Sequence, residues 1–206
     1  MTKSASIAIV IYSTYGHITT LAEAVKKGVD ATGHATSIIY QVPETLPADV
    51  LAKKNAPPKP DYPIATPETL AEADGIIFGF PTHFGTFPAQ MKAFLDSTGA
   101  LWFECALVGK PTAAFTSTGN QSGGQETTIL SLLPFIAHQG MIFVPFGPSS
   151  PHLLAVDEVV GGSEWGAGTV ASVTGKRLPS DREKEIAEAQ GKNFATFAAK
   201  LINTTI

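Results

Sequence analysis

Three short segments carry side chains that could hold an anionic, aromatic ligand. Residues 13–18 read Ser-Thr-Tyr-Gly-His-Ile and follow an apolar run, Ile7–Ile11. Hydroxyls and the free N–H groups at the start of a helix can bind phosphate without a lysine. Residues 81–88 carry aromatic rings and glycine, and residues 117–124 are small and polar. Together they offer phosphate donors, flat apolar surfaces and backbone amides, which are what flavin mononucleotide (FMN) requires.

Each of the three segments also has a simpler explanation. A Ser/Thr/Gly turn after a strand can be only a helix cap, and a Gly/Ser loop can be only a loop. The aromatic pair Phe84 and Phe87 fits a hydrophobic core as well as a stacking surface. The combination is more specific than any one segment, because all three follow predicted strands. The sequence therefore favours one flavin site over three unrelated turns.

The elements that would position these segments alternate along the chain. Apolar runs alternate with helix-like stretches, which is typical of an α/β protein with a parallel sheet, here in a single domain of residues 1–206. Ligands bind such sheets beyond the carboxyl ends of the strands, where the three segments lie. Residues 145–179 have many glycines, prolines and serines and no clear periodicity. We predict strands over residues 7–12, 35–40, 74–80, 112–116 and 141–144, and helices over residues 17–32, 89–97, 125–139 (kinked or split at Pro134) and from residue 180.

Composition limits the possible functions. The chain has 206 residues, 14 basic and 18 acidic side chains and a formal charge of −4, which argues against nucleic acid as a partner. No run approaches the roughly 18 consecutive apolar residues that a membrane span needs. The single cysteine, Cys105, excludes an internal disulfide and a multi-cysteine metal site. Residues 1–6 lack a secretory pattern, so we expect the cytoplasm.

Other nucleotide-binding motifs are absent or misplaced. The chain has no G-x-x-x-x-G-K-[ST] sequence, so a P-loop nucleotidase is unsupported. Residues 166–171 fit G-x-G-x-x-[GA], but no clear strand precedes them, and we reject a dinucleotide site there. Tyr12 and Ser13 stand where a phosphorylated receiver of similar fold would need acidic residues. The hydrolysis and receiver alternatives therefore fall away.

The three segments also belong to longer motifs. The sequence resembles the tryptophan repressor-binding protein family of flavodoxin-like NAD(P)H:quinone oxidoreductases (type IV), and in particular its fungal benzoquinone-reductase branch. The likeness runs nearly from end to end. It rests on residues 13–18, 78–85, 94–102, 115–119, 123–126 and 137–141.

This resemblance implies both a fold and an activity. The fold would be a flavodoxin-like, doubly wound sheet of five parallel strands in the order 2-1-3-4-5, with helices on both faces. The cofactor would be FMN, with no metal. The chain would use NADH or NADPH for the two-electron reduction of quinones to hydroquinones by a ping-pong mechanism. It would assemble as a homotetramer, a dimer of dimers.

The resemblance also implies which residues form the site. Tyr15 and Trp102 would contact the substrates, no side chain would be obligatory for catalysis, and His138 or Tyr15 could assist proton delivery. Gln139 takes the place of a second histidine found in many relatives. From the residues alone, His138 could interact only with a helix dipole, and Trp102 could be a packing residue. FMN would be bound by Ser13, Thr14, Tyr15, Gly16, His17, Ile18, Thr82, His83, Phe84, Gly85, Ser117, Thr118, Gly119, Asn120, Gln121, Ser122 and His138.

Two other functions fit the same fold. A flavodoxin-type electron carrier would bind FMN and pass single electrons, although the mild charge of this chain speaks against it. An FMN-binding scaffold protein would keep the fold without quinone reductase activity. Consumption of NADH with benzoquinone separates the enzyme from both.

Overall fold

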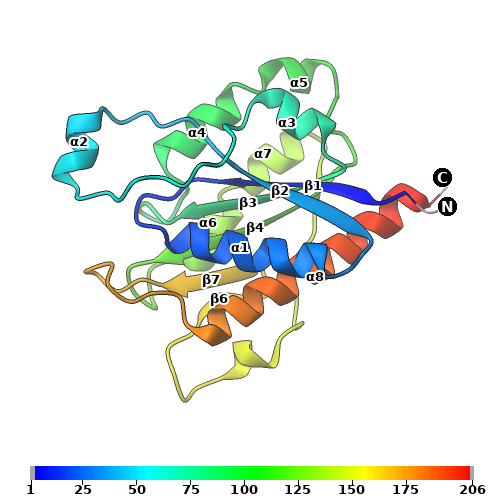
Figure 1. Cartoon of the computed structure of the whole chain (residues 1–206). Coiled ribbons are helices and arrows are strands. Elements are labelled where there is room, and N and C mark those ends of the chain that lie inside the picture. The colour runs from blue at the N-terminus through cyan, green and yellow to red at the C-terminus, as the bar shows by residue number, and fades with distance from the viewer. Residues whose placement is uncertain (1–2, 205–206) are drawn as a thin grey trace.

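The computed structural model describes residues 3–204 and contains one mixed sheet between two layers of helices (Figure 1). The strand order is β2-β1-β3-β4-β7-β6, and β5 also pairs with β4. The strands are β1 (Ala5–Ile11), β2 (Ala35–Gln41), β3 (Gly75–Pro81), β4 (Pro111–Thr118), β5 (Ile142–Phe143), β6 (Gly161–Ser163) and β7 (Gly166–Val170). The α-helices are α1 (His17–Asp30), α2 (Ala48–Lys53), α3 (Pro67–Glu72), α4 (Ala89–Asp96), α5 (Gly99–Phe103), α6 (Gln125–Leu130), α7 (Leu133–His138) and α8 (Asp181–Asn203), with a 3₁₀ turn at Pro151–Leu154.

The central strands are apolar on both faces because helices cover both. Ile9 of β1 pairs in register with Ile39 of β2 and Ile77 of β3. Successive side chains of a strand point to opposite faces. Ile9 therefore packs in the cluster under α1 and α8, whereas its neighbour Val10 packs in the cluster under α3, α4 and α7 (Figure 1). This doubly wound arrangement leaves the carboxyl ends of β1, β3 and β4 at one edge, where the candidate site lies.

The predicted α/β class and the strand order 2-1-3-4 are confirmed, but the prediction of five strands is wrong in number. Two strands, β5 and β7, share the position beside β4 that a single fifth strand was expected to occupy. The two-residue strand β5 pairs with the start of β4, and β7 pairs in parallel with its end, Thr116–Thr118. Strand β6 then pairs with β7 in antiparallel fashion. The segment 145–179, which we predicted to lack periodic structure, thus supplies two strands.

Strand β7 has no hydrophobic pattern because its backbone lies very close to that of β4. A Cβ atom added at Gly166 would lie 2.0 Å from the carbonyl oxygen of Ala114 in β4. The strand can pair there only because glycine brings no side chain. The small residues of its Gly-Ala-Gly-Thr-Val sequence are therefore explained by the lack of room for larger side chains beside β4, and not by a need to bury apolar surface.

The helices agree with the predicted boundaries in most places. The stretch 125–139 is split into α6 and α7, with Pro134 in the first turn of α7. Helix α8 begins where predicted, at a capping box in which Ser180 and Glu183 exchange hydrogen bonds with each other's backbone. Within residues 3–204, no helix has the length and apolar character needed to cross a membrane.

Candidate cofactor site

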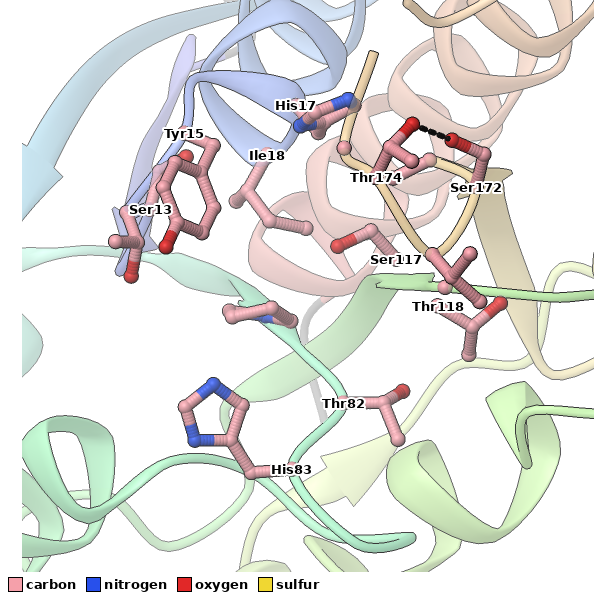
Figure 2. A pocket seen from close by; sticks show the side chains of 16 residues that line it. Ser13, Tyr15, His17, Ile18, Thr82, His83, Ser117, Thr118, Ser172 and Thr174 are labelled. Atoms are coloured by element: carbon pink, nitrogen blue, oxygen red, sulfur yellow. Dashed lines mark hydrogen bonds between the residues drawn. The ribbon is translucent and has the colours of Figure 1, made fainter. Parts of the chain in front are cut away.

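A cavity of about 330 Å³ opens at the carboxyl ends of β1, β3 and β4 (Figure 2). Four segments of the chain form its walls: the β1–α1 turn, the start of the β3–α4 loop, the end of β4, and the loop after β7. The lining residues are Ser13, Thr14, Tyr15, His17, Ile18, Pro81, Thr82, His83, Ser117, Thr118, Gly119, Ala171, Ser172, Val173, Thr174 and Gly175.

The β1–α1 turn offers donors to an anion. Gly16 is the N-cap of α1 with φ +90°, and its N–H donates to the Ser13 Oγ atom at 3.1 Å. The first helical hydrogen bond runs from the Thr20 N–H to the Gly16 carbonyl oxygen. The N–H groups of the three residues between them therefore have no partner within the helix. With the Ser13 and Thr14 hydroxyls, they match the donor set that a phosphate monoester requires.

The start of the β3–α4 loop is fixed by a tight turn. His83 and Thr86 exchange backbone hydrogen bonds of 2.8 and 3.2 Å, and Phe84 and Gly85 between them have φ values of 54° and 82°. A left-handed conformation costs a non-glycine residue roughly 1–2 kcal/mol, and such strain is common at functional sites. The turn leaves Phe84 fully exposed, and His83 lines the cavity.

His83 lies opposite Tyr15 across the cavity (Figure 2). The surrounding protein lowers the pKa of the His83 imidazole from its usual 6.5, first by burial and then through the positive charge of Lys54. The backbone of Lys54 is held near the site, because its carbonyl oxygen accepts a hydrogen bond from the Tyr15 hydroxyl at 3.4 Å. The structure therefore favours a neutral imidazole at this wall.

The end of β4 supplies the third wall. Ser117 accepts the Thr82 N–H through its carbonyl oxygen at 2.8 Å, which ties the second wall to the third. Beyond Gly119 the loop turns away from the cavity, and the Thr118 hydroxyl donates to the Asn120 carbonyl oxygen at 2.8 Å. Gln121 and Ser122 line a separate hollow beside α6 and β6.

The fourth wall, residues 171–175, was not predicted. Ser172 and Thr174 place hydroxyls beside the cavity, 2.9 Å from each other. Ser172 and Gly175 both have positive φ values. The sequence signal of this loop is a Ser/Thr/Gly turn after a strand, the same pattern as the β1–α1 turn, but β7 lacks the apolar run that would predict a strand before it.

The structure brings most of the predicted residues together in one chain, but not all. The predicted residues that line the cavity are Ser13, Thr14, Tyr15, His17, Ile18, Thr82, His83, Ser117, Thr118 and Gly119. Gly16, Phe84, Gly85, Asn120, Gln121, Ser122, His138 and Trp102 do not line it. His138 ends α7 and Trp102 lies on α5, and both are exposed. Among residues 3–204 there is no group of three or more histidine, cysteine or acidic side chains that could hold a metal ion.

Curated relatives resemble the chain over almost all of its length. It is 55% identical over 188 residues to a Candida albicans protein named NAD(P)H quinone oxidoreductase PST1, covering 91% of this chain and 94% of the relative. It is 50% identical over 200 residues to the Quinone-oxidoreductase QR2 of Triphysaria versicolor, covering 97% of this chain and 98% of the relative.

A solved structure and a family model give the fold and the family. The crystal structure of the flavodoxin, WrbA-like protein from Agrobacterium tumefaciens matches with a TM-score of 0.63 at 24% identity, over 96% of this chain and 99% of that chain, so the fold is flavodoxin-like. The family model described as NADPH-dependent FMN reductase matches residues 7–150, which include three of the four cavity walls. By that match and by relatives with half or more of their residues identical, this chain belongs to the NADPH-dependent FMN reductase family.

Proposed function

We propose that the chain is an FMN-dependent NAD(P)H:quinone oxidoreductase that reduces quinones to hydroquinones by two electrons. The observation that carries the proposal is the cavity, in which a lysine-free phosphate turn, an aromatic residue and small polar walls meet. The names of the relatives support the quinone as acceptor. The overall reaction takes one NAD(P)H, one proton and one quinone to NAD(P)⁺ and a hydroquinone.

The residues present fit FMN. Ser13, Thr14 and the first N–H groups of α1 would hold the phosphate, and Thr82, His83 and Ser117 would line the ring system. FMN would supply the chemistry of accepting a hydride from NAD(P)H and passing two electrons to a quinone. The chain's own contribution is to bind and orient the reactants and to keep a neutral imidazole at the cavity wall.

One cavity would serve both substrates in turn, which supports a ping-pong mechanism. Tyr15 stands at the cavity with about half of its surface exposed, in reach of whichever substrate is bound. NAD(P)⁺ would have to leave before the quinone enters. Parallel double-reciprocal plots are the expected kinetic result, and intersecting plots would contradict a shared site.

The expected homotetramer would explain two of the predicted residues that do not line the cavity, Trp102 and His138. Trp102 and His138 are exposed in their own chain, so a role at a flavin would require the cavity of a partner subunit. Trp102 and Phe103 form an exposed aromatic pair on α5, as subunit contacts often do. We propose a tetramer of single-domain chains on this basis. The cytoplasm is the proposed location, because metabolism supplies NAD(P)H inside the cell.

A steady-state assay tests the proposed activity. Purified protein reconstituted with FMN should consume NADH or NADPH rapidly when benzoquinone is added, and slowly without it. An electron carrier would bind FMN but consume little NAD(P)H with benzoquinone. A scaffold protein would bind FMN with no turnover, and protein that stays colourless after incubation with FMN would contradict the cofactor as well.

A further inference from the structure

The loop 171–175 forms a wall of the cavity, and its backbone is anchored at its two ends. It leaves the sheet at Ala171, whose N–H donates to the Thr118 carbonyl oxygen at 2.8 Å, and it closes where the Arg177 N–H donates to the Ala171 carbonyl oxygen at 3.1 Å. Val173 at its tip is largely exposed. The position of this wall therefore depends on what fixes the two ends of the loop.

Glu183 fixes the sheet end of the loop from behind. Its carboxylate is fully buried and accepts hydrogen bonds from the Gly161 and Val170 N–H groups and from the Thr169 hydroxyl, at 3.0, 3.1 and 2.8 Å. It also accepts the Ser180 N–H at 2.8 Å. A capping box needs only the last of these contacts. The other three tie the carboxylate to both strands of the β6–β7 hairpin.

Arg177 fixes the other end. Its Nη1 atom lies 3.0 and 2.9 Å from the two carboxylate oxygens of Glu183 and donates to the Val170 carbonyl oxygen at 2.7 Å. Its Nη2 atom donates to the Val159 carbonyl oxygen at 2.7 Å. A buried carboxylate is tolerated only when paired and fully hydrogen-bonded, and this guanidinium completes the set.

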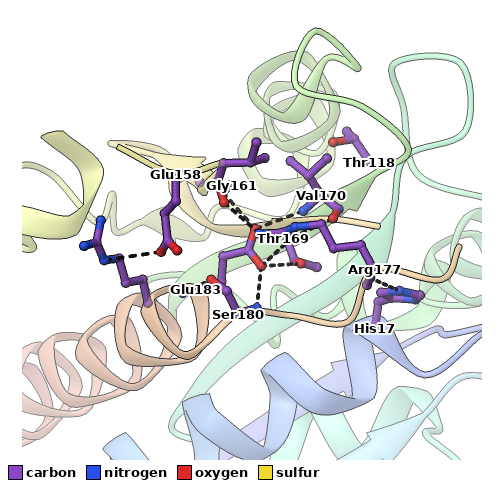
Figure 3. A network of polar contacts seen from close by, with 12 residues as sticks. His17, Thr118, Glu158, Gly161, Thr169, Val170, Arg177, Ser180 and Glu183 are labelled. Atoms are coloured by element: carbon purple, nitrogen blue, oxygen red, sulfur yellow. Dashed lines mark hydrogen bonds and ion pairs between the residues drawn. The ribbon is translucent and has the colours of Figure 1, made fainter. Parts of the chain in front are cut away.

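The backbone of Arg177 extends the network to the phosphate turn. The carbonyl oxygen of Arg177 accepts a hydrogen bond from the Nε2–H of His17 at 2.9 Å, and His17 is the first residue of α1 (Figure 3). Since a carbonyl oxygen can only accept, this contact places a proton on Nε2 and fixes the ring. One residue thus joins the buried carboxylate, the loop 171–175 and the anion-binding end of α1.

We propose that Arg177 and Glu183 are positioning residues of the cofactor site, which hold the loop 171–175 and His17 against a bound FMN. The ligand portion concerned is the polar, phosphate-bearing chain of the flavin, because this wall faces the hydroxyl-rich β1–α1 turn. The inference rests on the proposed function, since it needs FMN in this cavity. It goes beyond the predicted site, which contains neither residue nor the loop.

Titration of the apoprotein with FMN, followed by flavin fluorescence, tests the proposal. Arg177→Met and Glu183→Gln should each weaken FMN binding about tenfold or more, as loss of a supporting residue commonly does. Arg177→Lys, which keeps the charge but cannot bind the Val159 and Val170 carbonyl oxygens together, should fall between Arg177→Met and the unmodified protein. Arg182→Met is the matched control, because Arg182 is next to Glu183 in sequence and forms exposed ion pairs with Asp157 and Glu158, but touches no cavity wall. It should leave affinity within about twofold.

A second control separates positioning from simple destabilisation. The Lys110 ammonium donates to three carbonyl oxygens at the end of α3, at the opposite edge of the sheet, so Lys110→Met should lower the melting temperature without changing FMN affinity. Tryptic cleavage after the exposed Lys176 gives a readout independent of affinity and activity. At saturating FMN, the cofactor should slow this cleavage in the unmodified protein, and less so in the Arg177→Lys variant, because the loop is held less firmly there.

The outcomes are distinct. The inference is overturned if Arg177→Met and Arg177→Lys bind FMN within about twofold of the unmodified protein. It is also overturned if Lys110→Met, at the same melting temperature as these variants, loses as much FMN affinity as they do. If the unmodified protein binds no FMN, the proposed function fails first. A folded Arg177→Lys variant keeps the test valid should Arg177→Met not fold.

Discussion

At the scale of single residues, His83 and Lys54 give the site its electrostatic character. Burial and then the Lys54 charge lower the pKa of His83. Removing the cation should therefore move that pKa up toward the usual value. We expect Lys54→Met to raise the His83 pKa, measured from the imidazole proton shifts of the apoprotein during an NMR pH titration. Lys53→Met is the control, because Lys53 pairs with Asp49 and should leave His83 unchanged.

The sign of this shift is a strict test. A lowered pKa means that the protonated imidazole is disfavoured, so the fraction of neutral His83 at a pH near 6 should fall when Lys54 is removed. An unchanged or lower pKa in Lys54→Met would show that burial alone sets the value.

Gly16 is the second residue whose contribution can be tested by a single substitution. Its φ of +90° is left-handed, and a Cβ atom added there would meet nothing within 4 Å, so only backbone strain opposes Gly16→Ala. The strain of about 1–2 kcal/mol would turn the N–H groups of the phosphate turn away from their ligand. Gly33 at the other end of α1 has φ +67° and equally open surroundings.

Gly16→Ala and Gly33→Ala therefore form a matched pair. Both should lower the free energy of unfolding by about 1 kcal/mol, but only Gly16→Ala should weaken FMN binding, by about tenfold. Calorimetric titration with FMN and urea unfolding measure the two effects. Equal FMN affinity in both variants would mean that this turn does not hold the phosphate.

At the scale of elements, α1 and α8 pack so closely that glycine is required in both. A Cβ atom at Gly28 would lie 1.9 Å from the Glu188 carbonyl oxygen, and one at Gly191 would lie 2.1 Å from the Val25 carbonyl oxygen. Gly28→Ala should lower the free energy of unfolding by about 1–3 kcal/mol, because the helices must separate. Gly99→Ala, which meets open space in α5, should change it by less than about 1 kcal/mol. Urea midpoints that coincide for the two variants would contradict this packing.

The elements also show what a sequence can reveal. Strands β1 and β3 could be predicted because their uninterrupted apolar runs match a sheet covered on both faces. Strand β7 could not, because its residues are chosen for close approach to β4, and small residues carry no apolar periodicity. The loop 171–175 could not be predicted either, because it follows a strand that carries no apolar periodicity. Its place in the cavity depends on Glu183, whose capping-box role was visible but whose contacts with two distant strands were not.

At the scale of the whole molecule, the cavity combines four segments that lie between residues 13 and 175. Three of these four walls can be predicted from the sequence. The predicted roles of Trp102 and His138 stay predictions, because each lies outside the cavity of its own chain and depends on subunit contacts that one sequence does not specify. A site shared by NAD(P)H and quinone needs only one open cavity, which this fold provides at the carboxyl edge of its sheet.

The most direct test of the proposed enzyme is to follow the flavin absorbance of the FMN-loaded protein under anaerobic conditions through two additions. One equivalent of NADH or NADPH should bleach the oxidised flavin band, and one equivalent of benzoquinone should restore it fully, with one hydroquinone formed. A flavin that stays oxidised with both reductants, or one that is bleached but not restored by benzoquinone, would contradict the account.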